Sequence, residues 1–130
     1  MTVQIVMAVL IRGDELLLCH RHPDREWYPD VWDLPGGHVE DGEEPHVALA
    51  RELVEELGIN VEPDPEPLLG VSFDDIDAQV WRITNWRGEV RNTAPHEHDA
   101  IAWFSPADLA DLSMAAPAIG DLCRLAVEAG

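Results

Sequence analysis

The sequence contains no lysine: all eight basic residues are arginines, set against 26 aspartates and glutamates. The resulting net charge of −18 gives a surface that repels nucleic-acid phosphates and anionic membranes. This balance argues against a protein that binds polynucleotides or membrane surfaces. A small anionic substrate remains compatible with it, provided that divalent cations lie between the substrate and the carboxylates.

Cysteine and long apolar segments are also scarce. The two cysteines, Cys19 and Cys123, show no CxxC spacing, so a disulfide framework is not indicated, and Cys19 is expected in the core. No apolar run approaches the ~20 residues that cross a bilayer. The N-terminal stretch lacks the basic start and the small-residue cleavage site of a signal peptide. A cytoplasmic location is therefore the expectation.

The mixture of predicted strands and helices indicates one α/β or α+β domain with a mixed sheet over residues 1–130. We found no internal repeat and no linker that would separate domains. Helices are predicted at 45–57, from Pro106 with Ser105 as the N-cap, and at 117–129. Strands are predicted at 3–11, 15–20, 31–34, 68–73, 79–86 and 100–104.

The central predicted helix combines an apolar face with an acidic one. The apolar face is expected to carry Val47, Ala50, Leu53, Val54 and Leu57. The opposite face is expected to carry three glutamates, Glu52, Glu55 and Glu56. Like charges at this spacing repel one another, and Mg²⁺ or Mn²⁺ would compensate them, because clustered carboxylates are the ligands these ions prefer. Taken alone, the pattern also fits an ordinary solvated acidic surface.

A longer pattern surrounds these glutamates. Gly37 is followed after five residues by Glu43, and after seven more by the run RELVEELGI at 51–59. The segment resembles the Nudix box, G-x5-E-x7-REUxEExGU with U an aliphatic residue, at every defined position. The opening hairpin, the WDLPGG motif before the box and a late tryptophan strand extend the resemblance over most of the chain. The chain is thus similar to the small MutT-like Nudix hydrolases.

The resemblance implies a Nudix α/β/α sandwich that hydrolyses a nucleoside diphosphate linked to another group. It implies Mg²⁺ as the cofactor, with Mn²⁺ as a substitute. The implied metal ligands are the carbonyl of Gly36 and the carboxylates of Glu52, Glu55 and Glu56. In MutT-like enzymes the position of Glu52 is the proposed general base, whereas other members place the base elsewhere. Glu43 and Arg51 are expected to orient the carboxylates by hydrogen bonds.

One acidic residue outside the box also matches the family. In the stretch HEHDAIAW, Glu97 stands six residues before Trp103, a spacing similar to that of a glutamate in MutT-like enzymes. The resemblance implies that Glu97 is a metal ligand or the general base, and a plain surface acid is the alternative. His96, His98 and Asp99 could suggest a transition-metal site, but neighbouring histidines in one loop seldom supply the geometry.

The substrate is less well defined by the sequence. Arg21 could contact a phosphate or a base, and Trp27 and Tyr28 could stack on a nucleobase, whereas Trp32 and Trp103 are expected to be core aromatics. The MutT group that prefers oxidised guanine has an asparagine before its last helix. The corresponding stretch SMAAPAI has none, which weighs against 8-oxo-dGTP.

The favoured function is therefore a (d)NTP pyrophosphohydrolase that releases a nucleoside monophosphate and pyrophosphate. ADP-ribose or another nucleoside diphosphate derivative is the alternative substrate class. A non-catalytic nucleotide-binding regulator is the alternative of a different kind. The expected partner is a small nucleotide, with no nucleic-acid polymer and no membrane, and the chain is expected to be a monomer or a homodimer.

Overall fold

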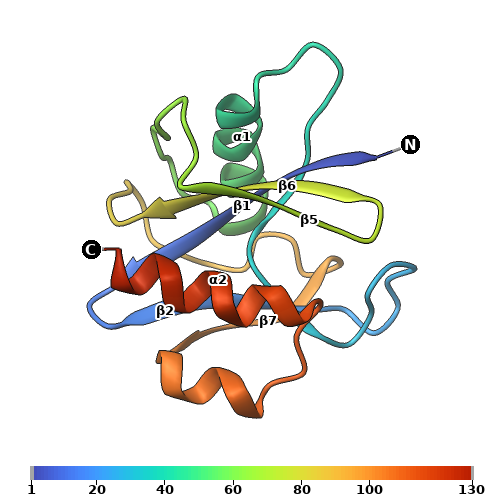
Figure 1. Cartoon of the computed structure of the whole chain (residues 1–130), viewed down its shortest axis with the longest axis vertical. Coiled ribbons are helices and arrows are strands. Elements are labelled where there is room, and N and C mark those ends of the chain that lie inside the picture. The colour runs from blue at the N-terminus through green and yellow to red at the C-terminus, as the bar shows by residue number, and fades with distance from the viewer. Residues whose placement is uncertain (1, 130) are drawn as a thin grey trace.

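The computed structural model describes residues 2–129, so Met1 and Gly130 of the predicted domain lie outside the described part. Figure 1 shows the arrangement of its elements. In chain order these are β1 (Val3–Arg12), β2 (Glu15–Arg21), β3 (Trp32–Asp33), β4 (Gly36–His38), α1 (Pro45–Leu57), β5 (Leu69–Phe73), β6 (Ile76–Ile83), β7 (His98–Phe104), the 3₁₀ helix η1 (Pro106–Asp111) and α2 (Pro117–Glu128). No helix within residues 2–129 is long and apolar enough to span a bilayer.

Strand β1 is the centre of the mixed sheet. It runs parallel to β6, from the pair Val3 and Ile76 to the pair Leu10 and Ile83, and antiparallel to β2 and β4. The strand order is β3-β2-β1-β6-β5, with β4 paired to β1 and β7 paired to β2. Helix α1 covers one face, whereas α2 and η1 pack on the other (Figure 1). The predicted α/β/α sandwich is confirmed.

The core lies on both faces of β1, because alternate side chains of a strand point in opposite directions. Val6, Ala8 and Leu10 pack toward α1, and the intervening residues pack toward α2. Cys19 is fully buried, as predicted. Trp32 and Trp103 are partly buried and pack against the two opposite sides of this core.

Strand boundaries are where the structure departs most from the predicted elements. Strand β6 spans Ile76–Ile83 instead of 79–86, and β7 begins at His98 instead of Ala100. β6 starts early because its first residues pair with both β1 and β5. It ends early because β1 pairs with β2 after Leu10. The three residues of β4 had no strand signal of their own.

The predicted apolar face of α1 is correct at Leu53 and Leu57 and wrong at Val47 and Val54. Its buried residues are Ala48, Leu49, Leu53, Glu56 and Leu57. Val47 and Val54 are each 48% exposed, whereas Glu56 is only 2% exposed. At ~100° per residue, Glu56 lies about 20° from Leu49 around the helix axis, and the two valines lie on the far side. The leucine stripe that packs on the sheet therefore takes Glu56 inward with it.

The corrected orientation of α1 predicts a difference between two neighbouring residues. Leu53→Ala should lower the free energy of unfolding by about 2–5 kcal/mol, because Leu53 is fully buried and its loss leaves a cavity. Val54→Ala should change it by less than about 1 kcal/mol, because that side chain is half exposed. Urea denaturation of both variants measures the difference. Equal losses at the two positions would contradict the observed orientation.

Candidate functional site

Two glycines allow the candidate site to form where β4 meets α1. A Cβ atom on Gly36, whose φ is +147°, would lie 1.9 Å from the carbonyl oxygen of Val6 in β1. A Cβ atom on Gly37 would lie 2.6 Å from the carboxylate carbon of Glu52. Gly36 is thus a steric requirement, because only glycine lets β4 approach the backbone of the central strand, whereas a side chain at Gly37 would displace the Glu52 carboxylate.

The carboxylate of Glu56 is buried at this junction. The amide N–H of Gly36 donates to Glu56 Oε1 across 3.4 Å, and the Nε2 atom of His98 lies 3.3 Å from the same oxygen. Burial raises the pKa of Glu56 well above its ordinary value, and the charges of Glu52 and Glu97 raise it further. The three carboxylates therefore share one electrostatic environment, in which a proton or a cation is strongly favoured.

Arg51 holds the outer side of the cluster. Its guanidinium donates two hydrogen bonds to Glu43, of 2.9 and 3.0 Å, which hold the pKa of Glu43 below its ordinary value. A third bond of 3.0 Å goes to Glu52 Oε1, and a longer contact of 3.4 Å goes to Glu55. Glu55 is 55% exposed and so points away from the buried side. The predicted link between Arg51, Glu43 and the acidic helix is present in the geometry.

The C-terminal end of α1 is bound to the segment that leads to Glu97. Thr93 donates its hydroxyl to the carbonyl of Glu55 (2.7 Å) and its amide to that of Glu56 (2.9 Å). The amide of Arg91 donates to Leu57 O (3.0 Å). These bonds satisfy carbonyls that a helix end leaves without partners. They also fix the later loop relative to the glutamates of the helix.

Glu97 lies between this segment and the loop after β2. Its carbonyl accepts hydrogen bonds from the amide of His22 (2.9 Å) and from Arg25 Nη1 (3.4 Å). Arg25 Nη1 also lies 3.9 Å from the carboxylate of Glu97. Glu97 acts on the pKa of Glu56, so the structure brings it into the electrostatic environment of the box glutamates.

Of the predicted substrate residues, Arg21 ends β2, and Trp27 and Tyr28 lie in the loop between β2 and β3. The Arg21 guanidinium donates to the carbonyl of Tyr28 (2.9 Å) and to that of Trp27 (2.8 Å). Its Nη1 atom is 3.6 Å from Asp33 Oδ2. The Tyr28 hydroxyl donates to Asp74 (2.6 Å), whereas Trp27 is 70% exposed. Arg21 therefore organises the loop, and a contact of these three residues with substrate stays a prediction.

His98 is a residue of the site that the sequence did not reveal. It was grouped with His96 and Asp99, but the structure separates them: His98 is 4% exposed on the α1 side, whereas Asp99 contacts His20 Nδ1 (2.6 Å). A register irregularity between His20 and Arg21 reverses the alternation of β7. Burial lowers the pKa of His98 to about 4, so the ring is neutral at pH ~7.

A hard divalent cation fits the donors of this cluster. Within residues 2–129, no three or more His, Cys, Asp or Glu side chains form a ready-made metal cage. Mg²⁺ does not require one, because it keeps several waters and binds proteins through one or two carboxylates. Glu56 supplies such carboxylate oxygens, because it is buried beside Glu52 and within electrostatic reach of Glu97. The negative charge of this cluster is not balanced, so a bound cation would be stabilised there.

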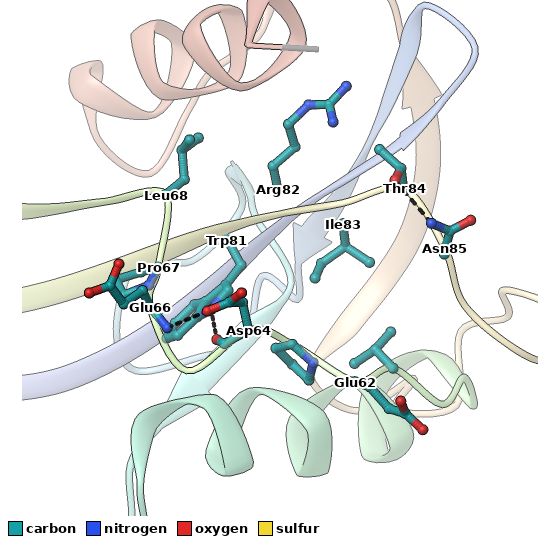
Figure 2. Close-up of a pocket in the computed structure, with 12 residues that line it drawn as sticks. Glu62, Asp64, Glu66, Pro67, Leu68, Trp81, Arg82, Ile83, Thr84 and Asn85 are labelled. Atoms are coloured by element: carbon teal, nitrogen blue, oxygen red, sulfur yellow. Dashed lines mark hydrogen bonds between the residues drawn. The ribbon is translucent and has the colours of Figure 1, made fainter.

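A surface groove of about 420 Å³ lies elsewhere, between the loop after α1 and β6 (Figure 2). Trp81 extends toward α1 and donates its indole N–H to Asp64 O (2.7 Å). Arg82 extends toward α2, where it binds the carbonyl of Ala126 (2.7 Å). No residue of the carboxylate cluster lines this groove.

Comparisons with known proteins agree with this geometry. The family model described as NUDIX domain matches residues 1–124. The CTP pyrophosphohydrolase of Escherichia coli (strain K12) is 34% identical over 107 residues, covering 80% of this chain and 76% of that protein. The protein named "Putative 8-oxo-dGTP diphosphatase 2" of Mycobacterium tuberculosis (strain ATCC 25618 / H37Rv) is 35% identical, covering 93% of this chain and 89% of that protein. The crystal structure of a MutT NUDIX hydrolase from Burkholderia pseudomallei has a TM-score of 0.78 and 29% identity, covering 98% and 97% of the two chains.

The burial of Asp33, the last residue of β3, predicts that the stability of the protein depends on pH. Burial raises its pKa from 3.8 to about 6, although Arg21 and the amide of Leu34 act in the opposite direction. A raised pKa in the folded state means that stability is lost as the pH rises through that value. Asp33→Asn should therefore stabilise the metal-free protein, relative to wild type, more at pH ~7.5 than at pH ~4.

Urea denaturation at the two pH values measures this difference, and Asp41→Asn is the matched control because Asp41 is exposed. If Asp33→Asn changed the free energy of unfolding by the same amount at both pH values, the raised pKa of Asp33 would be contradicted.

Proposed function

The chain belongs to the Nudix family, and from that premise we propose that it is a Mg²⁺-dependent pyrophosphohydrolase of (deoxy)nucleoside triphosphates, releasing nucleoside monophosphate and pyrophosphate. The chain is a hydrolase of phosphorus-containing acid anhydrides, as its family and its hydrolase relatives show. The observation that carries the proposal is the buried Glu56 carboxylate, placed beside Glu52 against the two glycines of β4. We propose that residues 37–59 are the reactive part of a single domain that acts in the cytoplasm.

The names of the relatives support the choice of a triphosphate. CTP and 8-oxo-dGTP, the nucleotides in those two names, are both nucleoside triphosphates. The chain has no asparagine in the stretch SMAAPAI, so recognition of an oxidised guanine would need other residues. We therefore propose the triphosphate class and leave the base to be identified by experiment.

We propose that the metal is held by the carboxylates of Glu52, Glu55, Glu56 and Glu97, together with the carbonyl of Gly36. When bound, Mg²⁺ neutralises the phosphate oxygens and lowers the pKa of a coordinated water. An enzyme with a net charge of −18 needs this neutralisation to approach a triphosphate at all. Glu56 is the ligand with the strongest support, because its buried charge has the greatest need of a cation.

For the general base we favour Glu52, with Glu97 as the alternative. The Glu52 carboxylate accepts a hydrogen bond from Arg51 at 3.0 Å and lies where a side chain at Gly37 would displace it. A fixed carboxylate of this kind can take the proton of the attacking water without first being ordered. Glu43 acts through Arg51, because its two hydrogen bonds set the orientation of the guanidinium that Glu52 contacts.

The loop between β2 and β3 is the proposed substrate-binding segment. Arg21 fixes the carbonyls of Trp27 and Tyr28, and the largely exposed Trp27 ring is available to stack on a nucleobase. Tyr28 is already bound to Asp74 through its hydroxyl. Its ring, not its hydroxyl, is therefore the part proposed to meet a base.

A nucleotide panel tests the reaction. Protein freed of metal with EDTA should cleave nothing, and addition of Mg²⁺ or Mn²⁺ should restore release of pyrophosphate from one or more nucleoside triphosphates. Pyrophosphate and orthophosphate are assayed separately, with CTP, dCTP, 8-oxo-dGTP and ADP-ribose in the panel. Cleavage of ADP-ribose alone would favour the alternative substrate class. Strong thermal stabilisation by a nucleotide without turnover would indicate a binding protein instead.

A single substitution tests the assignment of Glu56. Glu56→Gln should lower kcat by ~10²-fold or more, the scale of losing one fixed electrostatic contact in an active site. The fold should persist, because the amide keeps the shape of the side chain and removes a buried charge. Glu89→Gln removes the same charge from an exposed turn and should leave kcat unchanged. Turnover of Glu56→Gln at the wild-type rate would refute the role of Glu56 as a ligand.

A further inference from the structure

We propose that His98 is a positioning residue, whose Nε2–H orients the Glu56 carboxylate through Oε1 and leaves Oε2 to bind the metal. The inference rests on the proposed function, because it deepens the account of the same metal site. Its starting point is the contact of 3.3 Å between His98 Nε2 and Glu56 Oε1. His98 does not belong to the Nudix box and comes from a strand at the opposite side of the site.

The two side chains are enclosed together. Only 6% of the His98 side chain and 3% of the Glu56 side chain are exposed, so bulk solvent cannot orient either group. Within residues 2–129, the buried Nδ1 atom of His98 has no hydrogen-bond partner. A neutral imidazole carries one N–H, and the ionised carboxylate that would bind a metal can only accept. The proton therefore belongs on Nε2, facing Glu56.

The unpaired Nδ1 atom indicates that stability alone does not explain this residue. Leaving a buried polar atom without a partner destabilises the folded state. An apolar side chain at this buried position would avoid that cost. The feature that an apolar residue would lack is the N–H directed at Glu56.

The contacts to Glu56 Oε1 come from two independent strands. Gly36 in β4 offers its main-chain N–H at 3.4 Å, and His98 in β7 offers Nε2 at 3.3 Å. The terminal torsion of a glutamate is broad, so a single donor leaves the carboxylate plane poorly defined. Two donors on the same oxygen fix that plane, and neither of them occupies Oε2. Loss of such an orienting contact typically weakens metal binding 10–100-fold.

The backbone around His98 is built to keep the ring in place. Its amide donates to Ala94 O (3.0 Å), and its carbonyl accepts from Asn92 Nδ2 (2.8 Å). The neighbouring Thr93 binds the carbonyls of Glu55 and Glu56. The segment 92–98 is thus hydrogen-bonded both to the backbone of His98 and to the end of α1 that carries Glu56.

Three substitutions separate positioning from a purely structural role. His98→Gln places an amide N–H near the position of Nε2, whereas His98→Asn reaches only to the position of Nδ1, and His98→Leu has no donor. Mn²⁺ binding to the metal-free protein is measured by electron paramagnetic resonance without nucleotide. Melting of the metal-free variants and kcat and KM with Mg²⁺ complete the comparison.

We expect His98→Asn and His98→Leu to bind Mn²⁺ about 10-fold or more weakly than wild type. Their kcat should fall while KM for the nucleotide changes little, and His98→Gln should restore both Mn²⁺ affinity and kcat. Wild-type Mn²⁺ affinity in all three variants would overturn the inference. A His98→Gln variant as impaired as His98→Leu would also overturn it, because the ring itself would then be required, for instance as a ligand.

The same measurements keep this inference apart from the proposed function. A wild-type protein that binds Mn²⁺ but cleaves no nucleotide would refute the function and still allow the three variants to be compared. A wild-type protein that binds no Mn²⁺ would overturn the inference. If His98→Leu does not fold, the two amide variants carry the comparison, and if none of the three folds, His98 is a core residue and the inference fails.

Discussion

The burial of one carboxylate, that of Glu56, is the constraint on which the rest of the site depends. An ionised carboxylate removed from water costs several kcal/mol unless it is paired. Here it contacts one main-chain N–H, one neutral imidazole and the Glu52 carboxyl group, while the charges of Glu52 and Glu97 add further negative potential. A divalent cation at this point would offset the free-energy cost of the buried negative charge and would also enable the chemistry. Metal binding and stability are therefore coupled.

The buried face of helix α1 contributes residues both to the hydrophobic core and to the candidate site. Leu49 and Leu53 attach it to the sheet, and Glu56 lies on the same inward side, close to the approach of β4. The packing that stabilises the domain is therefore also what aims the carboxylate. Arg51, one turn earlier, orders the outer acids through Glu43.

Local patterns were sufficient to predict the box and most of the elements, but not the short strand β4 or how the elements face one another. The bounds 45–57 of α1 and its end at Gly58, which has a φ of 68°, follow from nearby residues. The rotation of α1 about its axis does not, because Val54 and Leu53 are equally apolar in sequence and only the sheet selects between them. His98 was hidden for a similar reason: the irregularity between His20 and Arg21 has no sequence signature, yet it decides which side chain of β7 enters the site. Which residues contact the substrate is encoded in loops whose conformation depends on such tertiary contacts.

The attachment of Thr93 to the last carbonyls of α1 has a consequence for how the site is lost. Helix ends open more readily than helix centres, and such local openings need far less free energy than global unfolding. When the final turn of α1 frays, the anchor of the segment carrying Glu97 and His98 is released in the same event. The site would then come apart as one cooperative unit, in molecules whose sheet and remaining helices are still intact.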